Sequence, residues 1–297
     1  MCRINGGRLN SLPCALRHVI LYVKIGTEYR LNLPVISGVT EYKLGNKFAE
    51  TCRTATYDCT FQSKLSPVTA LNWFQEIAQL HSEELGLGFS FMEEKGLAWF
   101  LVKYDVRFIR YPVYDQRLII ETEAVAFDRF AAHRTFRLLS QTGELMVEAD
   151  SEWMMLDRDT GRVLRLNTIP ELAAYETAEK SEFKMRRLEK IDGPADQNKE
   201  FQVRYLDIDY NGHVNNVKYL VWAIETLPPE IINREEIERV RIIYKDQAFY
   251  GGTVTVKAVQ TGEFIWRTDI TDGDRRLCEV ELTMRERSEP VECTAAC

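Results

Sequence analysis

Residues 66–86 read SPVTALNWFQEIAQLHSEELG, and the strand-like run LAWFLVKYDVRFIR follows at 97–110. The apolar positions of the first stretch recur at helical spacing along one stripe, as expected of a helix with one buried face. These positions are Leu71, Phe74, Ala78 and His81. The pattern predicts a helix over about 68–85, with Ser66 as its N-cap and Gly86 at its end.

Strand-like runs surround this helix and are separated by turn signals typical of antiparallel strands. One run precedes the helix at 54–62, and four occur at 97–110, 117–126, 131–140 and 145–156.

The second half repeats the same order of elements. A strand is predicted at 200–205 and a helix over about 214–226, with a hairpin turn at Asp-Gly-Asp 272–274. The four later strands are predicted at 239–249, 253–260, 263–271 and 276–286.

A long helix followed by one antiparallel sheet buries that helix in the curve of the sheet, which is an α+β arrangement. Two copies in tandem can pack as a pseudo-dimer with one continuous sheet. We expect an N-terminal extension at 1–46, domains at 47–175 and 199–290, a charged linker at 176–198 and a tail at 291–297.

Composition excludes several classes of function. The formal net charge of −7 argues against nucleic acid as a partner, because phosphate binding needs a basic surface. No apolar run reaches the roughly 18 residues of a membrane span. Seven irregularly spaced cysteines fit neither a disulfide framework nor a metal site, so a reducing cytosol is the simplest compartment. Residues 1–46 are biased toward basic side chains, which leaves organelle targeting open.

The chemical signal is the string DIDYNGHVNNVKY at 207–219, where polar side chains crowd a loop and the first turn of a helix. Free N–H groups at a helix start can polarise a carbonyl oxygen. A carboxylate beside them can act as a general base or as a nucleophile. The same residue types also serve in ordinary turns and helix caps, which is the alternative interpretation.

The string 207–225 resembles the signature of the plant and bacterial acyl-ACP thioesterases, D-x-D-x-N-x-H-V-N-N-x-K-Y-x-x-W. Residues 66–86, 96–123 and 148–170 resemble the first half of the same family. The resemblance covers roughly 50–290. It implies two tandem hotdog domains, each with a long central helix wrapped by a curved antiparallel sheet. It also implies hydrolysis of fatty acyl-[acyl carrier protein] without a cofactor, which ends chain elongation in fatty acid biosynthesis.

The resemblance also implies the roles of particular residues. Asp209 takes the place of the essential carboxylate, Asn211 that of the residue which positions water or the thioester carbonyl, and His213 that of the essential histidine. Asn215 and Asn216 match the helix start that faces the thioester.

The family's first half holds the acyl chain in a tunnel. The resemblance therefore makes Trp73, Phe74 and Trp99 the expected tunnel wall.

One position departs from the family pattern. Gln247 stands where the family usually carries a glutamate, and glutamine cannot act as a base. We expect catalysis to depend on Asp209, with compensation by Asp246 or low activity as alternatives.

The first half lacks the polar cluster when the two helices are aligned. Laying Trp73-Phe74 over Tyr219-Leu220 predicts that Ser63, Leu65 and Pro67 stand opposite Asp209, Asn211 and His213. We therefore expect one active site in each chain.

Two other functions remain open. One is an acyl-CoA thioesterase of the same fold. The other is a non-catalytic acyl-binding module, which stays open because Gln247 cannot act as a base. A hotdog dehydratase matches poorly. Whether two chains pair as a homodimer also stays open. The basic residues Lys184, Arg186, Arg187 and Lys190 are either a solvated face or a docking site for an acidic carrier protein.

Overall fold

A computed structural model describes residues 47–173, 183–191 and 193–287. The predicted extension, the predicted tail and the first part of the predicted linker lie outside the described residues. All of the described residues belong to one compact unit, which spans Tyr42–Cys297.

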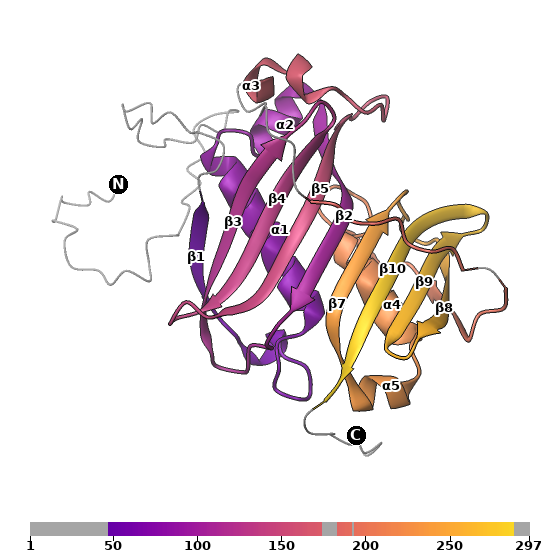
Figure 1. Cartoon of the computed structure of the whole chain (residues 1–297). Coiled ribbons are helices and arrows are strands. Elements are labelled where there is room, and N and C mark those ends of the chain that lie inside the picture. The colour runs from indigo at the N-terminus through magenta and orange to yellow at the C-terminus, as the bar shows by residue number, and fades with distance from the viewer. Residues whose placement is uncertain (1–46, 174–182, 192, 288–297) are drawn as a thin grey trace, which may run out of the picture. The chain divides into compact units, whose positions relative to one another are not determined.

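Ten strands in the described residues form a single antiparallel sheet in the order β1-β3-β4-β5-β2-β7-β10-β9-β8-β6 (Figure 1). The first half supplies β1 (Phe48–Arg53), β2 (Leu97–Phe108), β3 (Arg117–Phe127), β4 (Ala131–Ser140) and β5 (Leu145–Asp157). The second half supplies β6 (Gln197–Gln202), β7 (Glu235–Tyr244), β8 (Thr253–Gly262), β9 (Ile265–Asp272) and β10 (Arg275–Glu286).

The two long helices, α1 (Pro67–Glu84) and α4 (Asn216–Thr226), lie on the same face of this sheet (Figure 1). All four residues of the predicted stripe of α1 are buried, as the helical spacing predicted. On α4 the buried apolar residues are Val217, Tyr219, Leu220, Trp222 and Ala223. Both helices therefore form because each one buries an apolar face against the sheet.

The two halves join where β2 pairs with β7. The pairing is antiparallel and runs from Lys103 opposite Ile243 to Arg107 opposite Arg239. On either side of this pair the strand order repeats, since β5, β4, β3 and β1 match β10, β9, β8 and β6. The expected α+β fold, two helices wrapped by one continuous sheet in a pseudo-dimer, is confirmed.

Some predicted boundaries were wrong. Residues 54–62 form no strand but a loop with one turn of 3₁₀ helix at Thr56–Asp58. Strand β7 ends at Tyr244, so residues 245–249 form a loop, and α4 begins two residues later than predicted. Three short helices were not predicted: α2 (Phe89–Lys95), α3 (Pro170–Ala173) and α5 (Pro229–Arg234).

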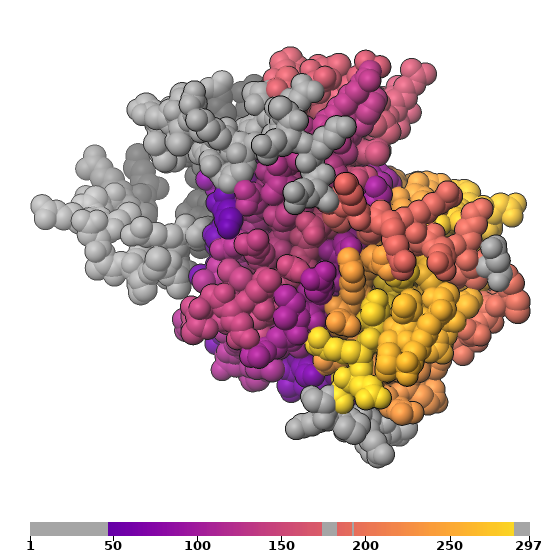
Figure 2. Space-filling view, viewed as in Figure 1, coloured from indigo at the N-terminus to yellow at the C-terminus, as the bar shows by residue number. Residues whose placement is uncertain are grey.

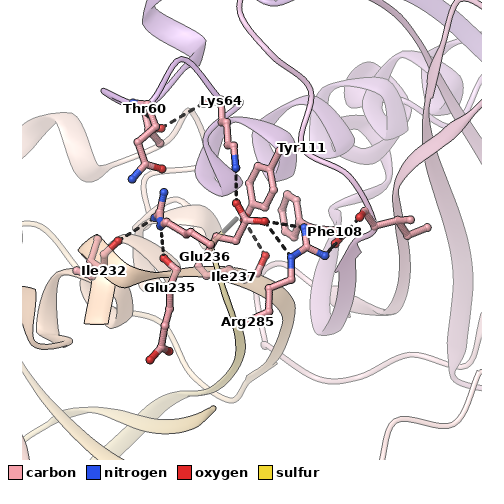
Figure 3. Close-up of polar contacts among 12 residues, drawn as sticks. Thr60, Lys64, Phe108, Tyr111, Ile232, Glu235, Glu236, Ile237 and Arg285 are labelled. Carbon is pink, nitrogen blue, oxygen red and sulfur yellow. Dashed lines mark hydrogen bonds and ion pairs between the residues drawn. The ribbon is translucent and has the colours of Figure 1, made fainter. Parts of the chain in front are cut away.

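A polar cluster lies at the seam between the halves, centred on Glu236 of β7 (Figure 3). Glu236 accepts from Lys64 at 2.6 Å and from Arg285 Nε at 2.9 Å. Arg285 also donates to the carbonyl of Phe108 at 3.0 Å, and Tyr111 donates to the carbonyl of Ile237 at 2.7 Å. This cluster ties a loop and a strand end of the first half to the second half.

The described part of the predicted linker crosses the sheet face opposite α4 (Figures 1 and 2). Leu188 is buried there, and Arg267 donates to the carbonyl of Glu189 at 2.8 and 3.2 Å. Among the described residues, no helix combines the length and the apolar character needed to cross a membrane.

Candidate active site

One cavity of about 740 Å³ is lined by residues of both halves. Nearly all of the residues singled out in the sequence line it. They are Asp209, Asn211, His213, Asn215, Asn216 and Gln247 from the second half, and Trp73 and Trp99 from the first. A cavity of this size is typical of small-molecule sites. The structure thus brings together side chains that lie up to 174 positions apart, from Trp73 to Gln247.

Phe74 is the exception among these residues. It lies on the sheet-facing side of α1, is fully buried and packs on the Phe136 ring at a centroid distance of 5.0 Å. Its neighbour Trp73 points about 100° away around the helix and lines the cavity, since successive helical residues diverge by that angle.

The loop before α4 is held by Asp207. Its buried carboxylate accepts the Arg204 N–H at 2.9 Å and forms ion pairs with Arg204 at 3.2 Å and Lys218 at 3.3 Å. Burial alone would raise the pKa of this carboxyl, but the hydrogen bonds from Arg204 and Lys218 outweigh burial and hold the pKa below its usual value. Asp207 is therefore an anchor for the loop that carries Asp209.

Asp209, Asn211 and His213 lie on the tight turn that follows this anchor. The Asp209 N–H donates to the carbonyl of His213 at 2.8 Å, and Asp209 Oδ1 accepts the Asn211 N–H at 2.8 Å. Gly212 has a φ of 81°, a conformation that glycine adopts without strain. The turn thus directs three alternate polar residues to one cavity.

The N-terminus of α4 opens onto the same cavity. Asn215 is the N-cap, because its Oδ1 accepts the Val217 N–H at 3.0 Å. Its carbonyl accepts the Lys218 N–H at 2.8 Å. In the described part of the chain the N–H of Asn216 has no acceptor. The first turn therefore offers one free donor and a positive helix end to a carbonyl oxygen.

Gln247 lies on the loop after β7, which two side chains hold in place. The Ala248 N–H donates to the hydroxyl of Tyr219 on α4 at 2.9 Å. From the other side, Arg275 donates to the carbonyl of Gln247 at 2.7 Å and forms an ion pair with Asp246 at 2.9 Å. Asp246 lines the cavity as well, and its carboxylate is paired with Arg275.

Sequence reasoning missed a partly buried arginine in the same cavity. Arg134 of β4 lines the cavity and donates to His81 Nδ1 at 2.8 Å and to Thr122 at 3.1 Å. Burial first, and the positive charge of Arg134 second, lower the pKa of His81 to about 4. His81 is therefore a neutral acceptor for Arg134. The helical stripe identified His81 as a core residue, but no local pattern could pair it with a strand 53 positions away.

The first half repeats the loop of the second half without its chemical groups. Each loop has a 3₁₀ turn, then an isolated bridge, Cys59 with Leu65 and Ile208 with Val214. The Ser66 N–H donates to the Asp58 carbonyl at 2.9 Å, as the Asn215 N–H does to the Asp207 carbonyl at 2.8 Å. The two loops therefore match at an offset of 149 residues.

This offset corrects the alignment made from the helices alone, which was wrong by three residues. The residues that stand opposite Asp209, Asn211 and His213 are Thr60, Gln62 and Lys64, not Ser63, Leu65 and Pro67. The helices misled because matching one pair of large side chains, Trp73-Phe74 with Tyr219-Leu220, does not fix the register of a whole helix. The first half nevertheless lacks the carboxylate and the histidine, as expected.

A smaller cavity of about 230 Å³ lies at the equivalent place beside Thr60, Gln62 and Lys64. There the Lys64 ammonium is held by Glu236 (Figure 3). Among the described residues, the cluster of a carboxylate, an amide and an imidazole on one turn therefore occurs only in the second half.

Two family models match this chain. The acyl-ACP thioesterase N-terminal domain matches residues 45–173, and the acyl-ACP thioesterase C-terminal domain matches residues 191–286.

Similar proteins come from plants and bacteria. The chain is 25% identical to oleoyl-acyl carrier protein thioesterase 1, chloroplastic, of Arabidopsis thaliana over 74% of this chain and 65% of that protein. A putative oleoyl thioesterase from Lactobacillus plantarum superposes with a TM-score of 0.76 and 26% identity over 82% of this chain and 98% of that one. The 12:0-ACP thioesterase from Umbellularia californica shares the fold, with a TM-score of 0.74 and 21% identity over 83% of this chain and 100% of that one. The chain spans 65%, 59% and 62% of the length of three curated plant relatives that it matches.

Proposed function

This chain belongs to the acyl-ACP thioesterase family, and we propose from that premise that it hydrolyses fatty acyl-[acyl carrier protein] to free fatty acid and carrier thiol. One observation carries the proposal. The turn with Asp209, Asn211 and His213, the free end of α4 and two tryptophans of the other half all line a single cavity. A thioester at the turn would place its alkyl chain among apolar side chains.

The chemistry follows from the groups at the turn. A water oxygen attacks the thioester carbon while Asp209 accepts its proton, or Asp209 attacks first and water then hydrolyses the acyl-enzyme. The carbonyl oxygen gains negative charge, which the Asn216 N–H and the positive end of α4 stabilise. The C–S bond then breaks, and His213 gives a proton to the leaving sulfur.

Asn211 and Gln247 serve as neutral hydrogen-bonding groups in this account. Each side chain offers both a donor and an acceptor, so each can hold the attacking water or the thioester carbonyl. We assign the role of base or nucleophile to Asp209, because Asp207 is buried in ion pairs and Asp246, which also lines the cavity, is bound by Arg275.

The division of labour between the halves is part of the proposal. Residues 47–175 hold the acyl chain, with Trp73 and Trp99 on the wall, and residues 199–290 carry out the hydrolysis. The partner is an acyl carrier protein, and the exposed basic residues of the linker are the surface offered for its docking. A cytosolic location stays a prediction, and organelle targeting by 1–46 and pairing as a homodimer stay open.

Fatty acid release from acyl-ACP substrates of several chain lengths tests the proposal, with the corresponding acyl-CoA series alongside. Release from acyl-ACP with little from acyl-CoA supports the carrier-protein substrate. Release from acyl-CoA alone would transfer the assignment to an acyl-CoA thioesterase. Tight binding of acyl chains without any release would leave an acyl-binding module.

A further inference from the structure

Arg275, at the first position of β10, contacts the loop that carries Gln247 through two different groups. Its Nη2 donates to the main-chain carbonyl of Gln247 at 2.7 Å. Its Nε and Nη2 also donate to Asp246 Oδ2, at 3.0 and 2.9 Å. The guanidinium thus spans two successive residues of the loop.

Asp246 also contacts the main chain of Gln247. Its Oδ1 accepts the Gln247 N–H at 2.8 Å, while its Oδ2 is held by Arg275. As a result, both main-chain groups of Gln247, the N–H and the carbonyl, are fixed by the same ion pair. On the next residue, the Ala248 N–H is fixed by the Tyr219 hydroxyl.

We propose that Arg275 is a positioning residue for Gln247, setting where the Gln247 amide lies in the catalytic cavity. The inference rests on the proposed thioesterase function. It also assigns Asp246 a definite part: its carboxylate relays the hold of Arg275 to the Gln247 N–H and does not act as the base. Asp246 and Gln247 both line the cavity, whereas Arg275, which holds them, is not among the lining residues.

This arrangement suits positioning better than stability. The side chains of Arg275 and Asp246 are 43% and 49% exposed, and ion pairs of such exposure add little to the free energy of unfolding. A shift of about 1 Å in a group that holds a reactant can, by contrast, lower a rate by about 10²-fold. The main effect of losing Arg275 should therefore be on kcat.

A double-mutant cycle tests the inference, using purified full-length chains and acyl-ACP. Arg275→Gln should lower kcat about tenfold with KM nearly unchanged, a coupling within the range seen for residues in contact. In the Gln247→Ala background the same change should have almost no further effect. Arg275→Lys should restore only part of the rate, because an ammonium cannot hold the carbonyl and the carboxylate in one fork.

The outcomes separate clearly. An equal loss from Arg275→Gln in both backgrounds, or no loss in either, would overturn the positioning role. A rate for Asp246→Asn as low as that of Asp209→Asn would overturn the part given to Asp246. An unmodified chain that releases no fatty acid would refute the proposed function itself, which a failed cycle in an active enzyme would not.

Discussion

Asp58 and Asp207 occupy equivalent positions in the two halves of the chain and make the same main-chain contacts. Each carboxylate accepts the main-chain N–H of the residue three positions earlier at 2.9 Å, from Ala55 and from Arg204. Each carbonyl accepts the N–H of the residue that caps the following helix. Within the part of the chain that the structure describes, Asp207 alone of the two forms ion pairs, and only its loop goes on to a carboxylate in the cavity.

Asp207→Asn should destabilise the chain. The buried carboxylate loses its charge-assisted contacts with Lys218 and Arg204, which for a buried group corresponds to roughly 1–3 kcal/mol. The folded-state pKa of Asp207 lies below its usual value, so its stabilisation is present above the unfolded pKa and is lost as pH falls through the folded pKa. Urea unfolding at neutral and at acid pH measures both effects.

Asp58→Asn is the matched control for that substitution. An asparagine oxygen can still accept the Ala55 N–H, and Asp58 has no ion pair of its own among the described residues. The loss of stability should therefore be clearly smaller than for Asp207→Asn. Equal losses would show that the ion pairs of Asp207 contribute nothing.

Glu236→Gln should lower the melting temperature and leave the rate of hydrolysis unchanged. Burial would raise the pKa of Glu236, but hydrogen bonds from Lys64 and Arg285 outweigh it and lower the pKa. The contribution of Glu236 to stability is therefore present above its unfolded pKa and disappears on acidification. Thermal unfolding between neutral pH and about pH 4 tests this, and an unchanged melting temperature at neutral pH would contradict it.

The protonation of His81 should make stability depend on pH in a defined window. Its pKa is about 4 in the folded chain against an ordinary value of 6.5, so the unfolded chain takes up the proton first. Stability should fall as pH decreases from about 6.5 to about 4, by at most roughly 3 kcal/mol from this residue.

His81→Gln isolates that contribution, because a glutamine oxygen can accept from Arg134 without titrating. The difference in unfolding free energy between the two chains should change with pH only within that window. A constant difference from pH 7 to pH 4 would show that His81 does not titrate as its surroundings indicate.

Much of the fold could be predicted because the main signals are local. The helical stripe of α1 and the alternation in 131–140 each report one buried face, and β4 matches its predicted bounds. The run 54–62 failed because alternation alone does not separate a strand from a loop that is fixed by Asp58. Hydrogen bonds to a distant loop, such as that from Thr54 to the Val113 carbonyl, hold this segment as a loop, and no local sequence pattern indicates them.

In the candidate site, too, some residues could be identified from the sequence, and others depend on contacts between distant segments. Asp209, Asn211 and His213 could be identified because the string 207–225 resembles the family signature, whereas their residue types alone also fit an ordinary turn and helix cap. The roles of Arg134 and Arg275 depend on contacts across strands that no spacing encodes. Phe74 was expected on the tunnel wall, but adjacent helical residues face different directions, and only Trp73 lines the cavity.

Gln247→Glu tests what the departure from the family pattern costs. A glutamate held by the same main-chain contacts would add a carboxylate to the cavity, so the rate should be kept or raised at neutral pH. The gain should disappear below the pKa of the new side chain. A variant that folds normally but loses activity would show that the amide N–H of Gln247 is required.

Fatty acid release from acyl-ACP by the unmodified chain, Asp209→Asn and Thr60→Val tests the central claim most directly. The asparagine keeps the acceptor for the Asn211 N–H, so the turn should stay folded while the base or nucleophile is lost. Thr60 stands at the equivalent place in the first half. We predict release by the unmodified chain and by Thr60→Val, and at least a 10²-fold loss in Asp209→Asn with an unchanged melting temperature. The account would be contradicted if Asp209→Asn released fatty acid as fast as the unmodified chain, or if the unmodified chain released none.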